Sequence, residues 1–328
     1  MIRIYRNDID QFVVLENTNG ALLEDSMVWF DLDHPSGAEE AWFEETFGID
    51  LPTREDMKGI EPSSRLYREN GATYMTGTLI WKADSETPEE THVGFILVGG
   101  RLVTIRYAEP RPFTAFQLYA ARNATICSGG ATALLGLMEA IVDRTAEILE
   151  HNGAKVERLS QNISSRRLKG GASRKVRGDE LEKHLGEIVA CQNLSAKIRD
   201  SLMSLARMVS FMPLAKEFEN APQLRENIVS LEHDIKSLLD HTGFLNGTLN
   251  FLLDAALGLI NIEQNSIIKI FSIAAVVFLP PTLVASIYGM NFHTMPELDW
   301  RYGYPMALCL MVLSAVGPYM FFKRKGWL

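Results

Sequence analysis

The chain has 328 residues, of which 47% are hydrophobic, and a formal net charge of −9 at pH 7. This acidic balance argues against nucleic acid as the principal partner, because nucleic acids attract basic surfaces. No Gly-rich phosphate loop, His-Glu-x-x-His or Gly-x-Ser-x-Gly motif occurs, so nothing indicates an enzyme or an organic cofactor. Cys127, Cys191 and Cys309 lack disulfide or zinc spacing, as expected for a reducing compartment.

Residues 1–128 are expected to form an α+β domain, in which a mixed sheet packs against helices. Ser36 followed by Glu39 resembles a capping box, which predicts a helix through Phe47 that stops at Gly48. Apolar or alternating segments between turn residues predict six strands, of which the last three should form an antiparallel meander. These segments are Ile2–Tyr5, Gln11–Leu15, Met27–Leu32, Thr73–Trp81, His92–Val98 and Leu102–Tyr107.

Two polar groups in this domain raise the hypothesis of a metal site. Asp31, Asp33 and His34 could serve as ligands, but a strand end and the turn before Ser36 are the favoured interpretation. The second group lies between two predicted strands and is typical of a solvated loop. It consists of Asp84, Glu86, Glu89 and Glu90.

Residues 129–220 are expected to form a helical hairpin. Apolar residues recur at helical spacing on both sides of the basic segment 166–177, whose glycines and serine should break the helix. A solvated turn is favoured for this tip over a contact with lipid headgroups or nucleic acid. Helical periodicity resumes after Pro222 without a proline up to Lys269, which predicts a stalk helix over 221–268 that continues into the next segment.

Two apolar runs near the end, Ile270–Ile287 and Tyr304–Phe322, each have about the ~20 residues that a helix needs to cross a bilayer. A pair of soluble core helices is disfavoured, because such helices are shorter and carry a polar stripe. Basic residues precede the first apolar run and follow the second, whereas acidic residues predominate in the segment between the two runs. Both termini should therefore be cytoplasmic. The predicted order is a first membrane helix at 267–290, an outer loop at 291–303, a second membrane helix at 304–322 and a basic tail at 323–328.

The segment Tyr288-Gly289-Met290-Asn291 follows the first apolar run, with Met295-Pro296-Glu297-Leu298 just behind it. Together with the C-terminal hairpin, these motifs resemble the CorA family of divalent-cation channels. The similarity continues upstream through residues 258–265 and Pro280-Pro281-Thr282. A zinc-specialised branch of the family usually has the asparagine but not the methionine, so Met290 favours the magnesium branch.

The resemblance implies a CorA-like fold and a Mg²⁺ channel that also takes Co²⁺ and Ni²⁺, in the bilayer of a bacterial-type inner membrane. It further implies a homopentamer whose selectivity filter is Gly289, Met290 and Asn291, with Asn291 forming a ring at the outer mouth. Mg²⁺ releases its water reluctantly, so neutral amide oxygens suit the hydrated ion. Gly289 would permit a tight turn, and Glu297 and Asp299 would raise the local cation concentration.

One face of the first membrane helix carries most of its small and hydroxyl residues, and with the motif it is interpreted as pore-lining. Packing of small residues in lipid is the alternative. One such face cannot enclose a path for ions, so several copies of the chain must surround a common axis. This implies a cyclic homo-oligomer. Ile268, Phe271 and Leu279 match family positions described as an apolar constriction, a barrier to a hydrated dication. Spacings of three or four place on this face Asn261, Asn265, Ile268, Ser272, Ala275, Leu279, Thr282 and Ser286.

The resemblance also implies regulation by cytoplasmic Mg²⁺, bound between the soluble domains of neighbouring subunits. Asp84 falls where the sheet-domain acid of this sensor is expected, with Asp234 or Asp240 on the stalk as its partner. Two other functions stay open. One is a zinc or other transition-metal transporter with the same fold, and the other is a membrane-tethered sensor or scaffold.

Overall fold

The structure is a computed structural model, and its chain divides into two compact units. The first unit comprises Met1–Gly170 with Leu185–Leu252, and the second comprises Gly171–His184 with Leu253–Leu328. The structure describes residues 1–15, 23–59, 65–85, 87–123, 125–168, 178–219, 221–290, 295–296 and 300–326.

A seven-stranded sheet forms the centre of the first unit, in the order β2-β1-β3-β7-β6-β5-β4. Neighbouring strands are antiparallel except β3 and β7, which are parallel. The six predicted strands and the antiparallel meander are confirmed, whereas the short β4 was missed. The strands are β1 (Ile2–Arg6), β2 (Gln11–Leu15), β3 (Met27–Asp33), β4 (Leu66–Glu69), β5 (Ala72–Trp81), β6 (Glu89–Val98) and β7 (Arg101–Arg106).

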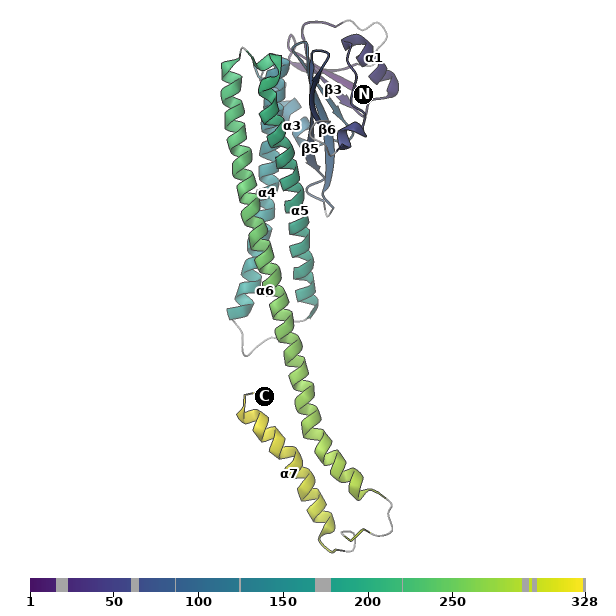
Figure 1. Ribbon diagram of the computed structural model, residues 1–328, viewed down its shortest axis with the longest axis vertical. Helices are drawn as coiled ribbons and strands as arrows, with labels where there is room; N and C mark the ends of the chain where they lie inside the picture. The colour runs from purple at the N-terminus through teal and green to yellow at the C-terminus, as the bar shows by residue number, and fades with distance from the viewer. Residues whose placement is uncertain are drawn as a thin grey trace. The chain divides into compact units, whose positions relative to one another are not determined.

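Helices cover both faces of this sheet (Figure 1). Successive side chains of a strand point to opposite faces, so Phe30 of β3 packs on Phe43 of α1 (Gly37–Phe47), and Trp29 packs on Phe116 of α3 (Arg111–Ala120). The predicted capping box of α1 is present, and Gly48 ends the helix with a φ of 63°. Short 3-10 turns connect other elements, namely η1 (Asp56–Lys58), η2 (Met212–Leu214) and η3 (Lys216–Phe218).

Two long helices, α4 (Gly130–Leu168) and α5 (Gly178–Phe211), approach the sheet closely at glycines. A Cβ on Gly130 at the start of α4 would lie 2.4 Å from the backbone carbonyl carbon of Arg101 in β7. A Cβ on Gly77 of β5 would lie 2.7 Å from the sulfur of Met208 in α5. The predicted helical hairpin is therefore docked on the sheet. The basic segment predicted as its tip lies mostly outside the described residues.

Helix α6 runs without interruption from Pro222 to Tyr288, which confirms the predicted continuous stalk helix. It passes through Pro280 and Pro281, both within its last stretch. Helix α7 (Gly303–Arg324) follows. By length and composition α6 and α7 could each cross a membrane, with mean hydropathies of 2.2 and 1.8 over their most apolar windows. Only 6% of either window is buried within the chain, unlike the core helices of soluble proteins.

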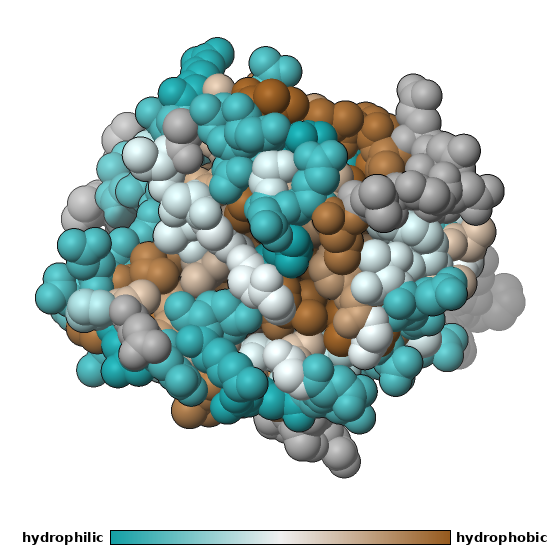
Figure 2. Space-filling model, turned by 90° about the horizontal axis from the view of Figure 1, so that it is seen from above, coloured by the Kyte–Doolittle hydropathy of each residue, from teal (hydrophilic) through white to brown (hydrophobic). Residues whose placement is uncertain are grey.

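The face drawn in Figure 2 is mainly hydrophilic, with smaller hydrophobic areas between the polar side chains. Such a mixture is ordinary for a surface in contact with water. It contrasts with the last part of α6 and with α7, where large apolar side chains such as Phe271, Phe278 and Leu313 are at least 70% exposed.

Candidate functional site

The predicted pore-lining residues all lie on α6, on a face that the single chain leaves exposed. Ile268 and Leu279 are 60% and 65% exposed, and Phe271 lies at the edge of the same face at 71%. A helix advances about 100° per residue, so the predicted set from Asn261 to Ser286 spans a narrow arc. These side chains are therefore available to face other copies of the chain.

The opposite side of the same stretch of α6 is the covered one. Ile273 is 6% exposed, and Val277, Val284 and Tyr288 are half-buried. Ala307 of α7 is 7% exposed. At about 100° per residue, the covered positions centre roughly 155° away from the predicted pore-lining set. The small and hydroxyl residues are thus not the ones buried within the chain.

The end of α6 carries the predicted filter motif. The backbone N–H of Gly289 still donates a helical hydrogen bond to Ala285 O at 2.9 Å, and that of Met290 donates to Ile287 O at 3.3 Å. Gly289 does not have a positive φ, so a left-handed backbone conformation is not the reason for glycine at this position. A Cβ there would instead lie 3.0 Å from Ala285 O, a tight contact. The remaining predicted mouth residues, Asn291, Glu297 and Asp299, lie outside the described residues.

Aromatic residues that the sequence analysis did not single out flank the start of α7. Trp300, Tyr302 and Tyr304 are 52%, 60% and 77% exposed, and the rings of Trp300 and Tyr302 meet edge to face. Tryptophan and tyrosine favour the boundary between lipid and water, where an apolar ring and a polar tip are both satisfied. Together with Lys323 and Arg324 in the last turn of α7, they match the flanks of a spanning helix.

Asp84, the predicted sensor acid, forms ion pairs with two arginines. Its Oδ2 lies 2.7 Å from Arg111 Nη1 and 2.8 Å from Arg144 Nη2. The Asp84 side chain is 57% exposed, so these pairs are accessible to solvent and to competing cations. A cation that binds Asp84 must therefore displace, or share the carboxylate with, at least one guanidinium.

The predicted stalk partner, Asp234, lies near acidic side chains of α4 in the same chain. Burial, then the charges of Asp234 and Glu147, raise the pKa of Asp143. Burial, then the charges of Asp143 and Asp234, raise the pKa of Glu139. The alternative partner, Asp240, is exposed on α6 and is rotated by about 120° from Asp234. The two stalk acids therefore do not act together in one chain.

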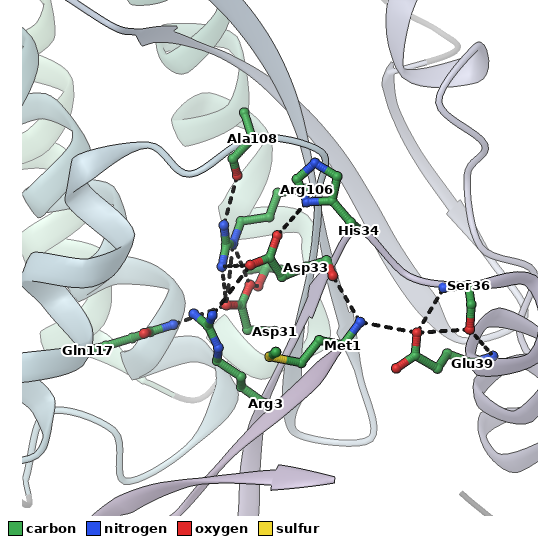
Figure 3. Close-up of polar contacts among 11 residues, drawn as sticks. Met1, Arg3, Asp31, Asp33, His34, Ser36, Glu39, Arg106, Ala108 and Gln117 are labelled. Atoms are coloured by element: carbon green, nitrogen blue, oxygen red, sulfur yellow. Dashed lines mark hydrogen bonds and ion pairs between the residues drawn. The ribbon is translucent and has the colours of Figure 1, made fainter. Parts of the chain in front are cut away.

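Asp31 and Asp33, two of the residues in the first metal hypothesis, are instead paired with a buried arginine (Figure 3). Arg106 Nε and Nη2 donate to the two oxygens of Asp31 at 3.0 Å each, and Nη2 also donates to Asp33 Oδ2 at 2.9 Å. Thr104 and Gln117 complete the hydrogen bonds of Asp31. The cluster joins β3, β7 and α3, and its role is structural.

Within the described part of the chain, no group of three or more His, Cys, Asp or Glu side chains is arranged to hold a metal ion.

Comparison with known proteins identifies the family. A family model described as CorA-like Mg²⁺ transporter protein matches residues 24–324. The magnesium transport protein CorA of Pasteurella multocida is 39% identical over 316 residues, which cover 95% of each chain. CorA of Yersinia pseudotuberculosis is 38% identical over 306 residues, or 92% of each chain.

Solved structures share the fold. The complete structure of the CorA magnesium transporter from Methanocaldococcus jannaschii matches with a TM-score of 0.76 and 19% identity, covering 100% of this chain and 98% of the other. The family model and the full-length relatives show that the chain belongs to the CorA-like Mg²⁺ transporter family.

Proposed function

We propose that the protein transports Mg²⁺ across a bacterial inner membrane, as one subunit of a homopentameric channel. Full-length relatives are magnesium transport proteins, and the family consists of transporters, not enzymes. The observation that carries the proposal is the exposed face of α6, on which the small and hydroxyl residues Ser272, Ala275 and Thr282 remain uncovered. Only several such faces around one axis enclose a path for ions.

Selectivity in this proposal belongs to Gly289, Met290 and Asn291 at the outer end of α6. A ring of neutral Asn291 amides would hydrogen-bond the water shell of Mg²⁺ and release the ion readily. Co²⁺ and Ni²⁺ are expected as further substrates, because they form hexahydrated ions of similar size. Glu297 and Asp299 would concentrate cations at the mouth.

The orientation in this proposal has both termini in the cytoplasm. Lys269 precedes the apolar part of α6, and Lys323, Arg324 and Lys325 follow that of α7. Thr294 belongs to the predicted outer loop at 291–303. If this loop faces outward, a Thr294→Cys variant should react with a membrane-impermeant maleimide in intact cells. Labelling only after the cells are opened would reverse the orientation.

Mg²⁺ flux into liposomes tests the function. The wild-type protein should carry Mg²⁺ without a proton gradient, with Co²⁺ and Ni²⁺ competing more strongly than Zn²⁺. Asn291→Ala should abolish this selectivity or the flux, whereas Asn250→Ala, on the stalk part of α6, should leave the ion order unchanged. Preferential Zn²⁺ uptake would assign a zinc transporter, and the absence of flux in the wild type would leave a tethered sensor or scaffold.

Regulation by cytoplasmic Mg²⁺ is the remaining part of the proposal. Mg²⁺ bound to Asp84, with Asp234 or Asp240 of a neighbouring subunit, would hold the apolar constriction at Ile268, Phe271 and Leu279 closed. The ion pairs of Asp84 with Arg111 and Arg144 compete with Mg²⁺ for the carboxylate. Asp84→Asn should therefore weaken the inhibition of flux by internal Mg²⁺. Unchanged inhibition would remove Asp84 from the sensor.

A further inference from the structure

A cavity lies within the first unit, beside the segment that carries Asp84, and none of the residues proposed for conduction or sensing is part of its lining. Its volume is about 580 Å³, within the usual range of small-molecule sites. Its walls come from α4, α5 and the connection between β5 and β6, which contributes Ala83, Ser85 and Pro88. Three elements distant in sequence thus line one space that is open to solvent on one side.

A buried amide in the wall of this cavity lacks a hydrogen-bond partner. Asn152 of α4 is 1% exposed, and its Nδ2 donates to Cys191 O at 3.1 Å and to Ser195 Oγ at 2.9 Å. These bonds to α5 fix the orientation of the amide. Its Oδ1 has no partner within the described part of the chain. A buried acceptor without a donor costs about 1–3 kcal/mol, so the wall of the cavity contains a polar group that the chain leaves unsatisfied.

Two cationic side chains line the same cavity. Lys155 and Arg158 lie one helical turn apart on α4. Arg158 Nε donates to Ala154 O at 3.2 Å, which leaves its two terminal nitrogens for another acceptor. Among the described residues, neither head group has an acidic partner.

Both charges act on the inner wall of the cavity. Burial raises the pKa of the Cys191 thiol, and the charges of Lys155 and Arg158 oppose this increase, while Glu187 adds to it. The wall therefore carries two positive charges against the one negative charge of Glu187. Leu159 and Leu194 add an apolar part to the lining.

We propose that this cavity binds a small phosphorylated metabolite of nucleoside-monophosphate size. Its phosphate group lies between Lys155 and Arg158. A phosphate dianion can pair with two cationic side chains, whereas a carboxylate with a single charge is matched by one. Its organic part lies against Leu159 and Leu194, next to the Asn152 amide. The volume exceeds that of inorganic phosphate alone, so the organic part contributes to binding.

Calorimetric titration of the full-length protein in detergent, at a fixed free Mg²⁺ concentration, tests the site. The probes are adenosine monophosphate and glucose 6-phosphate, each compared with its unphosphorylated parent, and inorganic phosphate. At least one phosphorylated probe should bind saturably, with its parent and inorganic phosphate weaker by about tenfold or more. Saturable binding of none of the phosphorylated probes overturns the proposal.

Matched variants locate the binding. Lys155→Met and Arg158→Met each remove one exposed charge and should weaken the binding by about tenfold. Arg207→Met is the control, because Arg207 of α5 is also exposed and also donates from Nε to the carbonyl four residues earlier, at 3.2 Å. Binding that is equally sensitive to all three variants, or to none, would place the ligand elsewhere and overturn the site.

Discussion

Arg106 holds together the buried polar cluster of the sheet domain. Its side chain is 2% exposed, and it satisfies Asp31, Asp33 and the carbonyl of Ala108. A buried ion pair adds little stability over an apolar packing of the same shape, because both charges lose their water. Removing one partner is different, since it leaves the other charge buried and uncompensated.

Arg106→Met should therefore destabilise the protein by about 3–5 kcal/mol, because two buried carboxylates lose their cation. The melting temperature in detergent measures this. Arg3→Met serves as the control: Arg3 lies 3.5 Å from Asp33 and is partly exposed, so its loss should have a small effect. Equal destabilisation by both variants would show that the position of the charge in the cluster is unimportant.

Asp143 gives a prediction about pH. Its pKa is raised by burial and then by the charges of Asp234 and Glu147, so the folded state binds this proton more tightly than the unfolded state. The contribution of Asp143 to the free energy of unfolding therefore falls as the pH rises through the raised pKa. Asp143→Asn should melt above the wild type at neutral pH, and the difference should shrink as the pH falls through the raised pKa towards the ordinary range of an aspartate.

The control for this titration is Glu226→Gln, which removes an exposed carboxylate at the start of α6. Its melting temperature should follow that of the wild type at every pH. A constant difference between Asp143→Asn and the wild type across the range would mean that charge repulsion at Asp143 is not the cause.

At the scale of elements, the docking of α4 on the sheet depends on the absence of a side chain at Gly130. The Cβ of an alanine would lie 2.4 Å from the carbonyl carbon of Arg101 and 2.6 Å from the backbone nitrogen of Leu102. Backbone atoms of a sheet strand cannot move aside as a flexible side chain does, so α4 would have to shift.

Gly130→Ala should therefore lower the melting temperature strongly, by several degrees or more. Gly186→Ala in α5 is the matched variant, because a Cβ there meets nothing within 4 Å. Alanine is better than glycine inside a helix by about 1 kcal/mol, so this variant should be neutral or stabilising. Similar losses in both variants would contradict the close-approach explanation.

Local patterns explain which elements the sequence predicted. Apolar runs between turn residues identified β3 and β6, the capping box fixed the start of α1 at Ser36, and the absence of proline predicted a continuous α6. The four-residue β4 has too few positions to show alternation. The ion pairs of Asp84 and of Arg106 join residues about 27–75 positions apart, and no local pattern reveals such pairs.

At the scale of the whole molecule, a single chain leaves apolar surface that lipid alone does not explain. Ile268, Phe271 and Phe278 of α6 lie within the predicted first membrane helix, where lipid or another copy could cover them. Phe244 and Phe251 precede it by several helical turns and are 70% and 61% exposed. Exposed apolar residues on a stalk that precedes the membrane segment indicate contact with other protein, and the further subunits of the proposed homo-oligomer would provide it.

Cysteine cross-linking tests which face of α6 meets these copies. Ser272→Cys lies on the proposed pore-lining face and Val277→Cys on the covered face, about 140° away. Cys127 and Cys191 are buried, so replacing the exposed Cys309 is sufficient to remove background reaction. Mild oxidation in membranes should cross-link Ser272→Cys into multimers and leave Val277→Cys monomeric, because only residues around a common axis lie near their own copies. The opposite pattern would place the Val277 side of α6 at the subunit interface and would exclude Ser272 and its neighbours from the pore.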